Sequence, residues 1–225
     1  MSQQRLILFT RYPVPGQTKT RLIPLLGTEG AAQLQRQMTE FTLVNLYPLW
    51  QSANVEIFVY YSGGDRDLIR AWLDPVIEPL NHPLTRLNGE LTSNHLRYQE
   101  QETGDLGQRM QGAFADAFRA GIERVVIIGT DCPGLTPALI QEALTALNND
   151  EVVLGPAKDG GYYLIGLNRP LPMLFQNIPW GSDRVFAQTQ AILEQHHLTY
   201  YVLKTLTDID RPEDLWLWEK RNGDR

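Results

Sequence analysis

The feature that most constrains the fold is the regular alternation, along the whole chain, of short apolar runs with longer amphipathic stretches. The clearest run is RVVIIGTD (124–131), which is rich in β-branched residues and ends in turn chemistry, as buried strands do. The stretch TPALIQEALTAL (136–147) follows with a helical period, Thr136 as its N-cap and Pro137 at the first helical position. Strands alternating with such helices predict an α/β fold with a mostly parallel central sheet flanked by helices.

The same patterns predict the remaining elements. Further strands are expected at 5–10, 55–64 and 199–206, two more within 151–167, and helices after Thr28 and at 65–73, 105–121, 182–196 and 211–221. The helix at 65–73 is expected to stop before Pro75, because a residue that precedes proline disfavours the helical conformation. The polar segment 74–103 has no period that predicts an element. Since no linker, repeat or low-complexity tract divides the chain, residues 1–225 are expected to form a single domain.

Charge and cysteine content argue against several classes of protein. The formal net charge of −6 argues against a general nucleic-acid binder, which normally presents a basic face. The single cysteine, Cys132, excludes an internal disulfide and a multi-cysteine zinc site. No apolar run approaches the roughly 18 residues needed to cross a bilayer, and the short first run does not resemble a secretory signal. A cytoplasmic protein without a membrane span or a nucleic-acid partner is therefore expected.

The first loop, PVPGQTKTRL (13–22), is basic although the protein is acidic. The first 28 residues contain four basic side chains and no Asp or Glu. Arg11, Lys19 and Arg21, together with backbone amides around Gly16, are the kinds of group that bind phosphates. The loop matches neither the Walker phosphate-binding motif nor GxGxxG. From these residues alone, a phosphate-binding loop and a solvated basic loop are equally favoured.

Carboxylates follow two of the expected strands. Asp131 stands at the exit of the most apolar strand, at the edge where ligands gather in open α/β sheets. Mg²⁺ needs only one or two protein carboxylates when it also binds substrate phosphates, so a metal ligand is favoured here over a turn residue. Asp208 and Asp210 follow the last expected strand, and a carboxylate there reaches Asp131 if the two strand ends are neighbours. The alternative is that Asp210 caps the last helix, while Cys132 is expected to be a packing residue.

Five ordered segments together resemble a known family. They are PVPGQTKTRL, GDLGQRM, GTDCPGL, LGPAKDGGYYLIGL and DIDRPEDL, and the resemblance extends over about residues 5–218. The segments resemble GT-A-like proteins long described as a domain of unknown function and as glycosyltransferases associated with arsenosugar biosynthesis. The wider superfamily is that of the nucleotide-diphospho-sugar transferases, which includes guanylyltransferases and CMP-sugar synthetases. The resemblance implies a Rossmann-like GT-A sandwich that binds a nucleotide through its N-terminal half.

The resemblance also implies roles for individual residues. The opening loop would hold the nucleotide phosphates, and Asp105 would lie near the nucleotide or the acceptor. Asp131 and Asp210 would bind Mg²⁺ or Mn²⁺. The role of Asp210 is implied by the similarity of DIDRPEDL to a VDTPEDL segment of CMP-sugar synthetases. The chain departs from the family patterns in two places: a proline-rich loop replaces the glycine-rich opening of the guanylyltransferases, and DCP replaces the DxD of many GT-A glycosyltransferases.

These observations lead to three functional hypotheses. The first is a metal-dependent glycosyltransferase that uses a nucleotide sugar, the second a nucleotidylyltransferase that uses an NTP and a phosphorylated acceptor, and the third a non-catalytic nucleotide-binding module. Lys19 would stabilise the leaving diphosphate, and Asp159 would act as general base toward a hydroxyl of a small-molecule acceptor. An Asp-Gly hairpin equally accounts for Asp159. The tryptophan-bearing last helix is the only indication of a homodimer.

Overall fold

A computed structural model describes residues 3–50, 54–78, 86–87, 90–91 and 96–223. One sheet is built from seven strands: β1 (Gln4–Arg11), β2 (Val55–Ser62), β5 (Arg97–Glu100), β6 (Arg124–Ile128), β7 (Val152–Pro156), β8 (Tyr162–Leu167) and β9 (Tyr200–Val202). Their spatial order is β5-β2-β1-β6-β8-β7-β9, and β3 (Arg86–Leu87) pairs separately with β4 (Glu90–Leu91). Only β8 runs antiparallel to its sheet neighbours β6 and β7, so the expected mostly parallel sheet is confirmed for the described residues.

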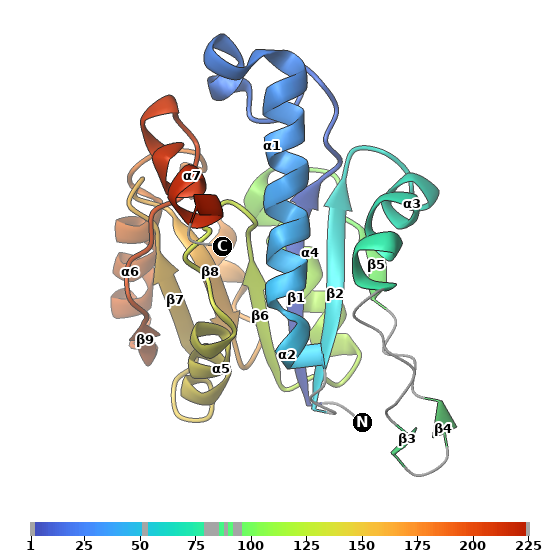
Figure 1. Cartoon of the computed structure of the whole chain (residues 1–225). Helices are drawn as coiled ribbons and strands as arrows, with labels where there is room; N and C mark the ends of the chain where they lie inside the picture. The colour runs from blue at the N-terminus through green and yellow to red at the C-terminus, as the bar shows by residue number, and fades with distance from the viewer. Residues whose placement is uncertain (1–2, 51–53, 79–85, 88–89, 92–95, 224–225) are drawn as a thin grey trace.

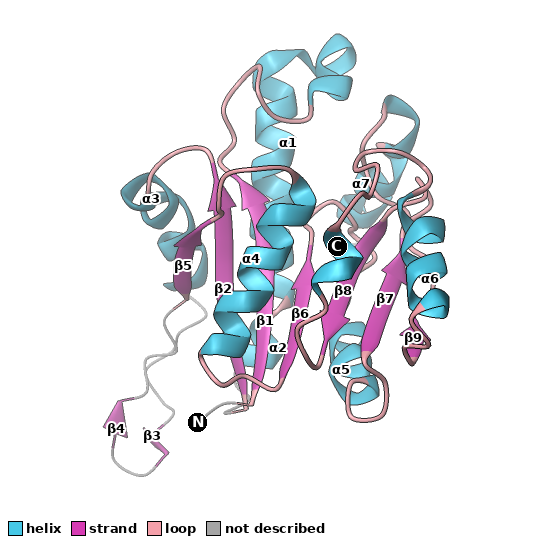
Figure 2. Ribbon diagram, turned by 180° about the vertical axis from the view of Figure 1, so that it is seen from behind, coloured by secondary structure: helices cyan, strands magenta, loops and turns pink. Residues whose placement is uncertain are grey.

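Helices cover both faces of the sheet (Figure 1). The α-helices are α1 (Ile23–Asn45), α2 (Tyr47–Trp50), α3 (Arg66–Ile77), α4 (Leu106–Arg119), α5 (Pro137–Ala146), α6 (Val185–Gln195) and α7 (Trp216–Gly223). Short 3₁₀ turns are η1 (Thr20–Leu22), η3 (Pro172–Phe175) and η4 (Pro212–Asp214). Figure 2 shows α4 and α6 on one face, while α1, α3 and α5 lie on the other. The molecule is thus the α/β sandwich predicted from the alternation of elements.

The core consists of two apolar layers, one on each side of the sheet. Alternate residues of a strand point to opposite faces, so Leu6 and Leu8 of β1 pack with α1 and α3, whereas Ile7 packs with α4. All three side chains are completely buried. Strands buried on both faces read as continuous apolar runs, which is why RLILFT and RVVII were recognisable in the sequence.

Helix starts follow the expected capping chemistry. The side chains of Asp65, Asp105 and Thr136 each accept a hydrogen bond from the backbone N–H three residues ahead, at the starts of α3, α4 and α5. In α1 the backbone of Gly27 is non-helical (φ 71°, ψ 170°), so the regular part of that helix begins at Thr28. Polar side chains therefore determine where these helices begin.

Two expectations at the edge of the sheet were wrong. Helix α3 does not stop before Pro75 but continues to Ile77, because Leu73 and Ile77 bury their side chains in the core and offset the backbone hydrogen bond that proline lacks. Strand β5 lies inside the segment 74–103, in which no element was expected, although part of that segment falls outside the described residues.

The C-terminal segment returns to the end of the sheet where β1 and β6 finish, and it packs on α1. Ile209 is fully buried and joins Leu22, Leu34 and Met38 in a third apolar cluster, against which α7 packs. The expected closing helix is η4 followed by α7. Within the described residues, no helix is long and apolar enough to span a membrane.

Candidate functional site

A cleft of about 460 Å³ opens at the carboxyl ends of β1 and β6. These two strands are parallel neighbours, and β1 also pairs in parallel with β2 on its other side. The chain passes from β1 through α1 to β2 on one side, and later from β5 through α4 to β6 on the other side of β1. The order of strands thus reverses at β1, which makes this edge a topological switch point, where open α/β sheets bind ligands. Four cationic and two acidic side chains line the cleft: Arg11, Lys19, Arg21, Arg109, Asp131 and Asp210.

The loop after β1 turns sharply to bring its basic residues to the cleft. The Gln17 N–H donates to the Val14 carbonyl (3.0 Å), and Gly16 between them has φ 78°, as the third residue of a type II turn requires. Pro15 precedes that glycine, at the position where proline pre-sets the backbone. Gly16 does not itself line the cleft, so its contribution in this structure is the turn that delivers the following basic residues.

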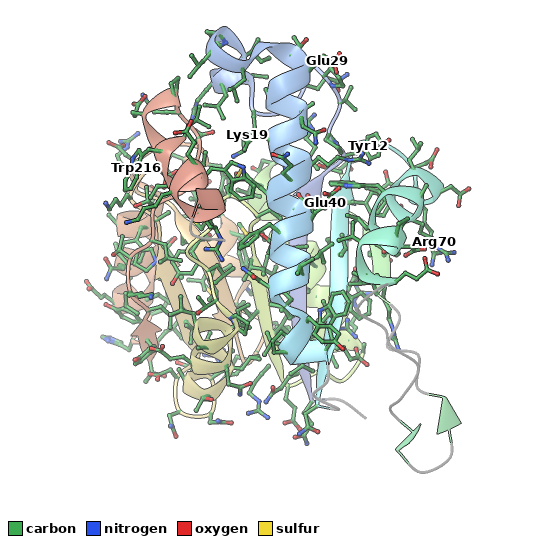
Figure 3. The ribbon with its side chains drawn as sticks, in the orientation of Figure 1. Tyr12, Lys19, Glu29, Glu40, Arg70 and Trp216 are labelled. Atoms are coloured by element: carbon green, nitrogen blue, oxygen red, sulfur yellow. The ribbon has the colours of Figure 1, made fainter. Side chains whose placement is uncertain are left out.

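Lys19 lies almost completely buried between this loop and the C-terminal segment (Figure 3). Its side chain is 3% exposed, and its Nζ lies 2.9 Å from Oδ1 of Asp131 and 2.6 Å from the carbonyl oxygen of Ile209. The Lys19 backbone is left-handed (φ 48°, ψ 43°), a conformation that side-chain-bearing residues rarely adopt. The Asp131 side chain is 47% exposed, so one of its oxygens meets the lysine while the group still faces the cleft.

Arg21 forms an ion pair with Asp210, and backbone contacts place Asp210 beside Asp131. The Ile209 N–H donates to the Asp131 carbonyl (2.8 Å), so the loop after β6 and the segment after β9 are neighbours. The carboxylate of Asp214 accepts from the N–H groups of Asp210 and Arg211, at 3.2 and 2.8 Å. Asp214, rather than Asp210, is therefore the residue that satisfies the backbone at the start of the last helical segment.

Asp208 lies within the influence of several other carboxylates. Burial, and next the charge of nearby Asp159, raise the pKa of Asp208 to about 6, with smaller contributions from Asp131 and Asp210. Burial also raises the pKa of the Cys132 thiol, and the charge of Asp208 adds to that effect. A buried thiol with a raised pKa is a poor nucleophile, in keeping with the packing role expected for this cysteine.

Polar residues that the sequence did not single out form the floor of the cleft. The hydroxyls of Thr10 and Thr39 lie 2.9 Å apart, and the Gln35 amide donates to Thr39 and to Thr130, both at 3.3 Å. All four side chains are buried, yet three of them line the cleft. Thr10 is the second-last residue of β1, and Thr130 lies two residues after β6, so their positions near strand exits were the available signal.

Gln101 and Arg109 also line the cleft. The Gln101 amide donates to the Tyr60 carbonyl (2.9 Å) and accepts from the Arg109 guanidinium (3.2 Å). Arg109 lies within the GDLGQRM segment, where only Asp105 had been considered. The Asp105 carboxylate caps α4 by accepting from the Gln108 N–H (2.9 Å), and this residue does not line the cleft.

Asp159 also lies outside the cleft lining, although its charge reaches Asp208. Its carboxylate accepts from the N–H of Gly161 (2.8 Å), the local bond expected of an Asp-Gly turn. The turn role expected of Asp159 is therefore observed, and its chemical role stays a prediction.

The carboxylates suit a divalent cation that arrives with phosphates. The described residues contain no group of three or more His, Cys, Asp or Glu side chains able to hold a metal ion by themselves. Asp131 and Asp210 nevertheless line one cleft together with cationic side chains. Because Mg²⁺ characteristically combines one or two protein carboxylates with substrate phosphates, this donor set fits such an ion and does not fit a self-contained metal centre.

Comparison with known proteins identifies a matching family and many similar structures. A family model described as "Uncharacterized protein conserved in bacteria (DUF2064)" matches residues 47–182. No curated protein sequence matches the chain. A crystal structure provisionally described as a nucleotide-diphospho-sugar transferase, from Desulfovibrio desulfuricans G20, is 32% identical, with a TM-score of 0.81 over 99% of this chain and 88% of that one.

More distant structures share the fold alone. A 4-diphosphocytidyl-2C-methyl-D-erythritol synthase from Anaerococcus prevotii DSM 20548 is 12% identical, with a TM-score of 0.59 over 100% of this chain and 99% of that one. Rv0371C from Mycobacterium tuberculosis H37Rv, in complex with manganese, is 13% identical, with a TM-score of 0.53 over 96% and 97% of the two chains. The sandwich predicted from the sequence is therefore a recurrent architecture.

Proposed function

Because this chain belongs to the DUF2064 family of bacterial proteins, we propose that it is a divalent-metal-dependent transferase that acts on a nucleotide-activated donor. The observation that carries the proposal is the convergence on one cleft of the opening-loop cations with Asp131 and Asp210. A diphosphate needs donors and positive charge, and these side chains supply both at a switch point of the sheet. The provisional description of the 32%-identical relative is compatible with this proposal.

Glycosyl transfer from a nucleotide sugar to a small-molecule acceptor is the reaction we favour. Lys19 and Arg21 would bind the diphosphate and stabilise the charge that develops on it as the bond to the sugar breaks. Asp131 and Asp210 would hold Mg²⁺ or Mn²⁺, which when bound offsets the same charge. Asp159 would accept the proton of a hydroxyl acceptor. The association with arsenosugar biosynthesis that the family resemblance implies would also be one of glycosyl transfer.

Nucleotidyl transfer is the second candidate, and the charge of the cleft favours it. Four cationic side chains face only two carboxylates in the lining, an excess that suits a triphosphate better than a diphosphate. The attacking group would then be an ionised phosphate of the acceptor, so no general base is required. Under this reading Asp159 would have only its turn role.

A thermal-shift experiment tests the proposal. The wild-type protein, Asp131→Asn and the matched surface control Asp67→Asn are melted with a panel of NTPs and nucleotide sugars, with and without Mn²⁺. A ligand at about 100 times its Kd stabilises by about 2.7 kcal/mol, which corresponds to roughly 5–10 °C in Tm for a chain of this size. We expect such a shift with Mn²⁺ for the wild type and the control, and a much smaller one for Asp131→Asn.

The pattern of shifts separates the hypotheses. Stabilisation by nucleotide sugars supports glycosyl transfer, and stabilisation by one NTP alone supports nucleotidyl transfer. Shifts that need no metal and survive Asp131→Asn support a non-catalytic binding module. A response to none of these ligands would contradict the proposal as a whole.

A further inference from the structure

Each acidic side chain in the cleft already has a cationic partner, and both partners come from the same short loop. Lys19 pairs with Asp131 at 2.9 Å, and Arg21 pairs with Asp210. The two pairs are joined at the backbone, since Ile209 donates its N–H to the Asp131 carbonyl and accepts from the Lys19 ammonium. In this arrangement the carboxylates that would bind a metal ion and the cations that would bind phosphates neutralise one another.

We propose that Lys19 and Arg21 are internal counter-ions that compete with a divalent cation for Asp131 and Asp210 until nucleotide phosphates draw them away. This inference rests on the proposed function, because it uses the same cleft and the same ligands. It adds a rule for binding: the free protein holds a divalent cation weakly, and the nucleotide increases its affinity.

Of the two pairs, the one made by Lys19 dominates. Its side chain is 3% exposed, whereas that of Arg21 is 58% exposed, so solvent screens the Arg21 charge far more strongly. The Lys19 ammonium is also held by the Ile209 carbonyl at 2.6 Å. A divalent cation that approaches Asp131 must therefore displace a buried ammonium that is held by two oxygen acceptors. If the ammonium stays in place, the two positive charges repel each other at close range.

The backbone of Lys19 supports the same interpretation. Its left-handed conformation is disfavoured for any residue with a side chain. The Lys19 carbonyl accepts from the Leu22 N–H at 2.8 Å, which fixes the residue at the start of η1. Strained residues persist where surrounding contacts hold them, and they concentrate at binding sites. Here the strain directs one long cationic side chain onto Asp131.

Thermodynamic linkage turns this geometry into a measurable coupling. If nucleotide phosphates bind the Lys19 and Arg21 side chains, the nucleotide raises the affinity of the protein for Mn²⁺. Mn²⁺ then raises the affinity for the nucleotide by the same factor. Removing the Lys19 charge has a distinctive effect, because it frees Asp131 in advance. The variant therefore binds Mn²⁺ alone more tightly, although it binds phosphates less tightly.

The test is a titration with Mn²⁺ alone, followed by electron paramagnetic resonance of the free ion. Wild type, Lys19→Met, Lys19→Gln, Arg21→Met and Lys220→Met are compared in the absence of nucleotide. Lys220 is exposed on α7, so its variant measures the general effect of removing one positive charge. We expect about tenfold tighter binding for both Lys19 variants, a smaller gain for Arg21→Met, and none for Lys220→Met. Adding Asp131→Asn to Lys19→Met should abolish the gain.

Mn²⁺ binding by the Lys19 variants that is equal to or weaker than wild-type binding would overturn the inference. So would a gain that survives Asp131→Asn, because the ion would then bind elsewhere. These arms contain no nucleotide, so their result is independent of the thermal-shift panel. Failure of every nucleotide to bind would end the proposed transferase function, whereas failure of the Mn²⁺ gain would end only the counter-ion inference.

Discussion

Ile209 is the residue that holds the two halves of the cleft together. Its side chain is completely buried among residues of η1 and α1, while its backbone bonds to the Asp131 carbonyl and to the Lys19 ammonium. One apolar side chain thus fixes the position of the carboxylates on either side of it, Asp208 and Asp210. In the segment DID (208–210) the middle side chain packs in the core and the side chains on either side of it are carboxylates, as the alternation of side chains along an extended backbone allows.

Asp208 makes the stability of the fold depend on pH. Its pKa is raised from 3.8 to about 6, mainly by burial and next by Asp159, so its ionisation opposes folding. Protonation of Asp208 therefore stabilises the native state relative to the unfolded state. This contribution is fully present below about pH 4 and is lost as the pH rises through 6. We expect Asp208→Asn, in EDTA, to be more stable than wild type by roughly 1–2 kcal/mol at pH 8.

Urea unfolding at pH 4, 6 and 8 measures this effect, and the exposed Asp67→Asn provides the control. The gain should shrink toward pH 4, because Asp208 is then protonated in the native state and no longer carries a buried charge. A difference of the same size at pH 4 and pH 8 would show that the charge of Asp208 is not its cause.

At the scale of elements, the turn between β7 and β8 packs against the first turn of α6 and the loop that precedes it. The Phe186 N–H donates to the Gly160 carbonyl at 2.8 Å. A Cβ on Gly160 would lie 2.1 Å from the Asp183 carbonyl oxygen, and the glycine has φ 89°. No side chain fits that space, so this glycine is required for the contact between the two loops.

We therefore expect Gly160→Ala to destabilise the protein by at least 3 kcal/mol, the sum of a left-handed backbone cost of roughly 1–2 kcal/mol and a steric clash. Gly121→Ala is the matched control, because Gly121 has φ 80° but nothing within 4 Å of its Cβ position. The control should lose only the backbone cost. Equal losses in chemical denaturation would contradict the steric explanation.

Elements with strong local signals could be predicted from the sequence, and elements without them could not. The capped helices that follow Asp105 and Thr136 were recognisable because their first residues carry their own capping groups. Strand β5 was missed because it is a sheet edge in which only Tyr98 is buried, so it contains no apolar run. The extension of α3 past Pro75 depends on tertiary burial, which no local pattern reports.

At the scale of the whole molecule, the strand order brings the site together. Lys19, Asp131 and Asp210 were each recognisable as candidates, yet their convergence requires β1 to lie next to β6 and the C-terminal segment to return over both. Local sequence patterns do not predict the order of strands in a sheet. The buried hydrogen bonds that run from Thr10 through Thr39 and Gln35 to Thr130 were unpredictable for the same reason, because they join segments far apart in sequence.

The central position of β1 predicts cooperative unfolding. This strand contributes to both apolar layers and pairs with β2 and β6 at once, so it joins the two halves of the sheet through backbone and core. We expect one urea transition, with the same midpoint by tryptophan fluorescence and by far-UV circular dichroism. Two separated midpoints would contradict the single-domain organisation.

The assembly of the molecule is less constrained than its fold. Trp218 packs against Phe41 with ring centroids 5.7 Å apart, whereas Trp216 on the same helix is 56% exposed. Figure 3 labels Trp216 beside α7. A homodimer through the last helix stays a prediction, and Trp216 is the residue whose replacement would test it.

The contact between Lys19 and Ile209 joins positions 190 apart. A ribosome adds about 5–20 residues per second, so roughly 10–40 seconds pass between synthesis of the lysine and synthesis of its carbonyl partner. In the later part of that interval Lys19 and Asp131 have both been made, whereas the segment that completes the cleft has not. A chain that ends before residue 207 would therefore lack both Asp210 and the Ile209 carbonyl that accepts from Lys19, so the cleft would keep only one of its two carboxylates.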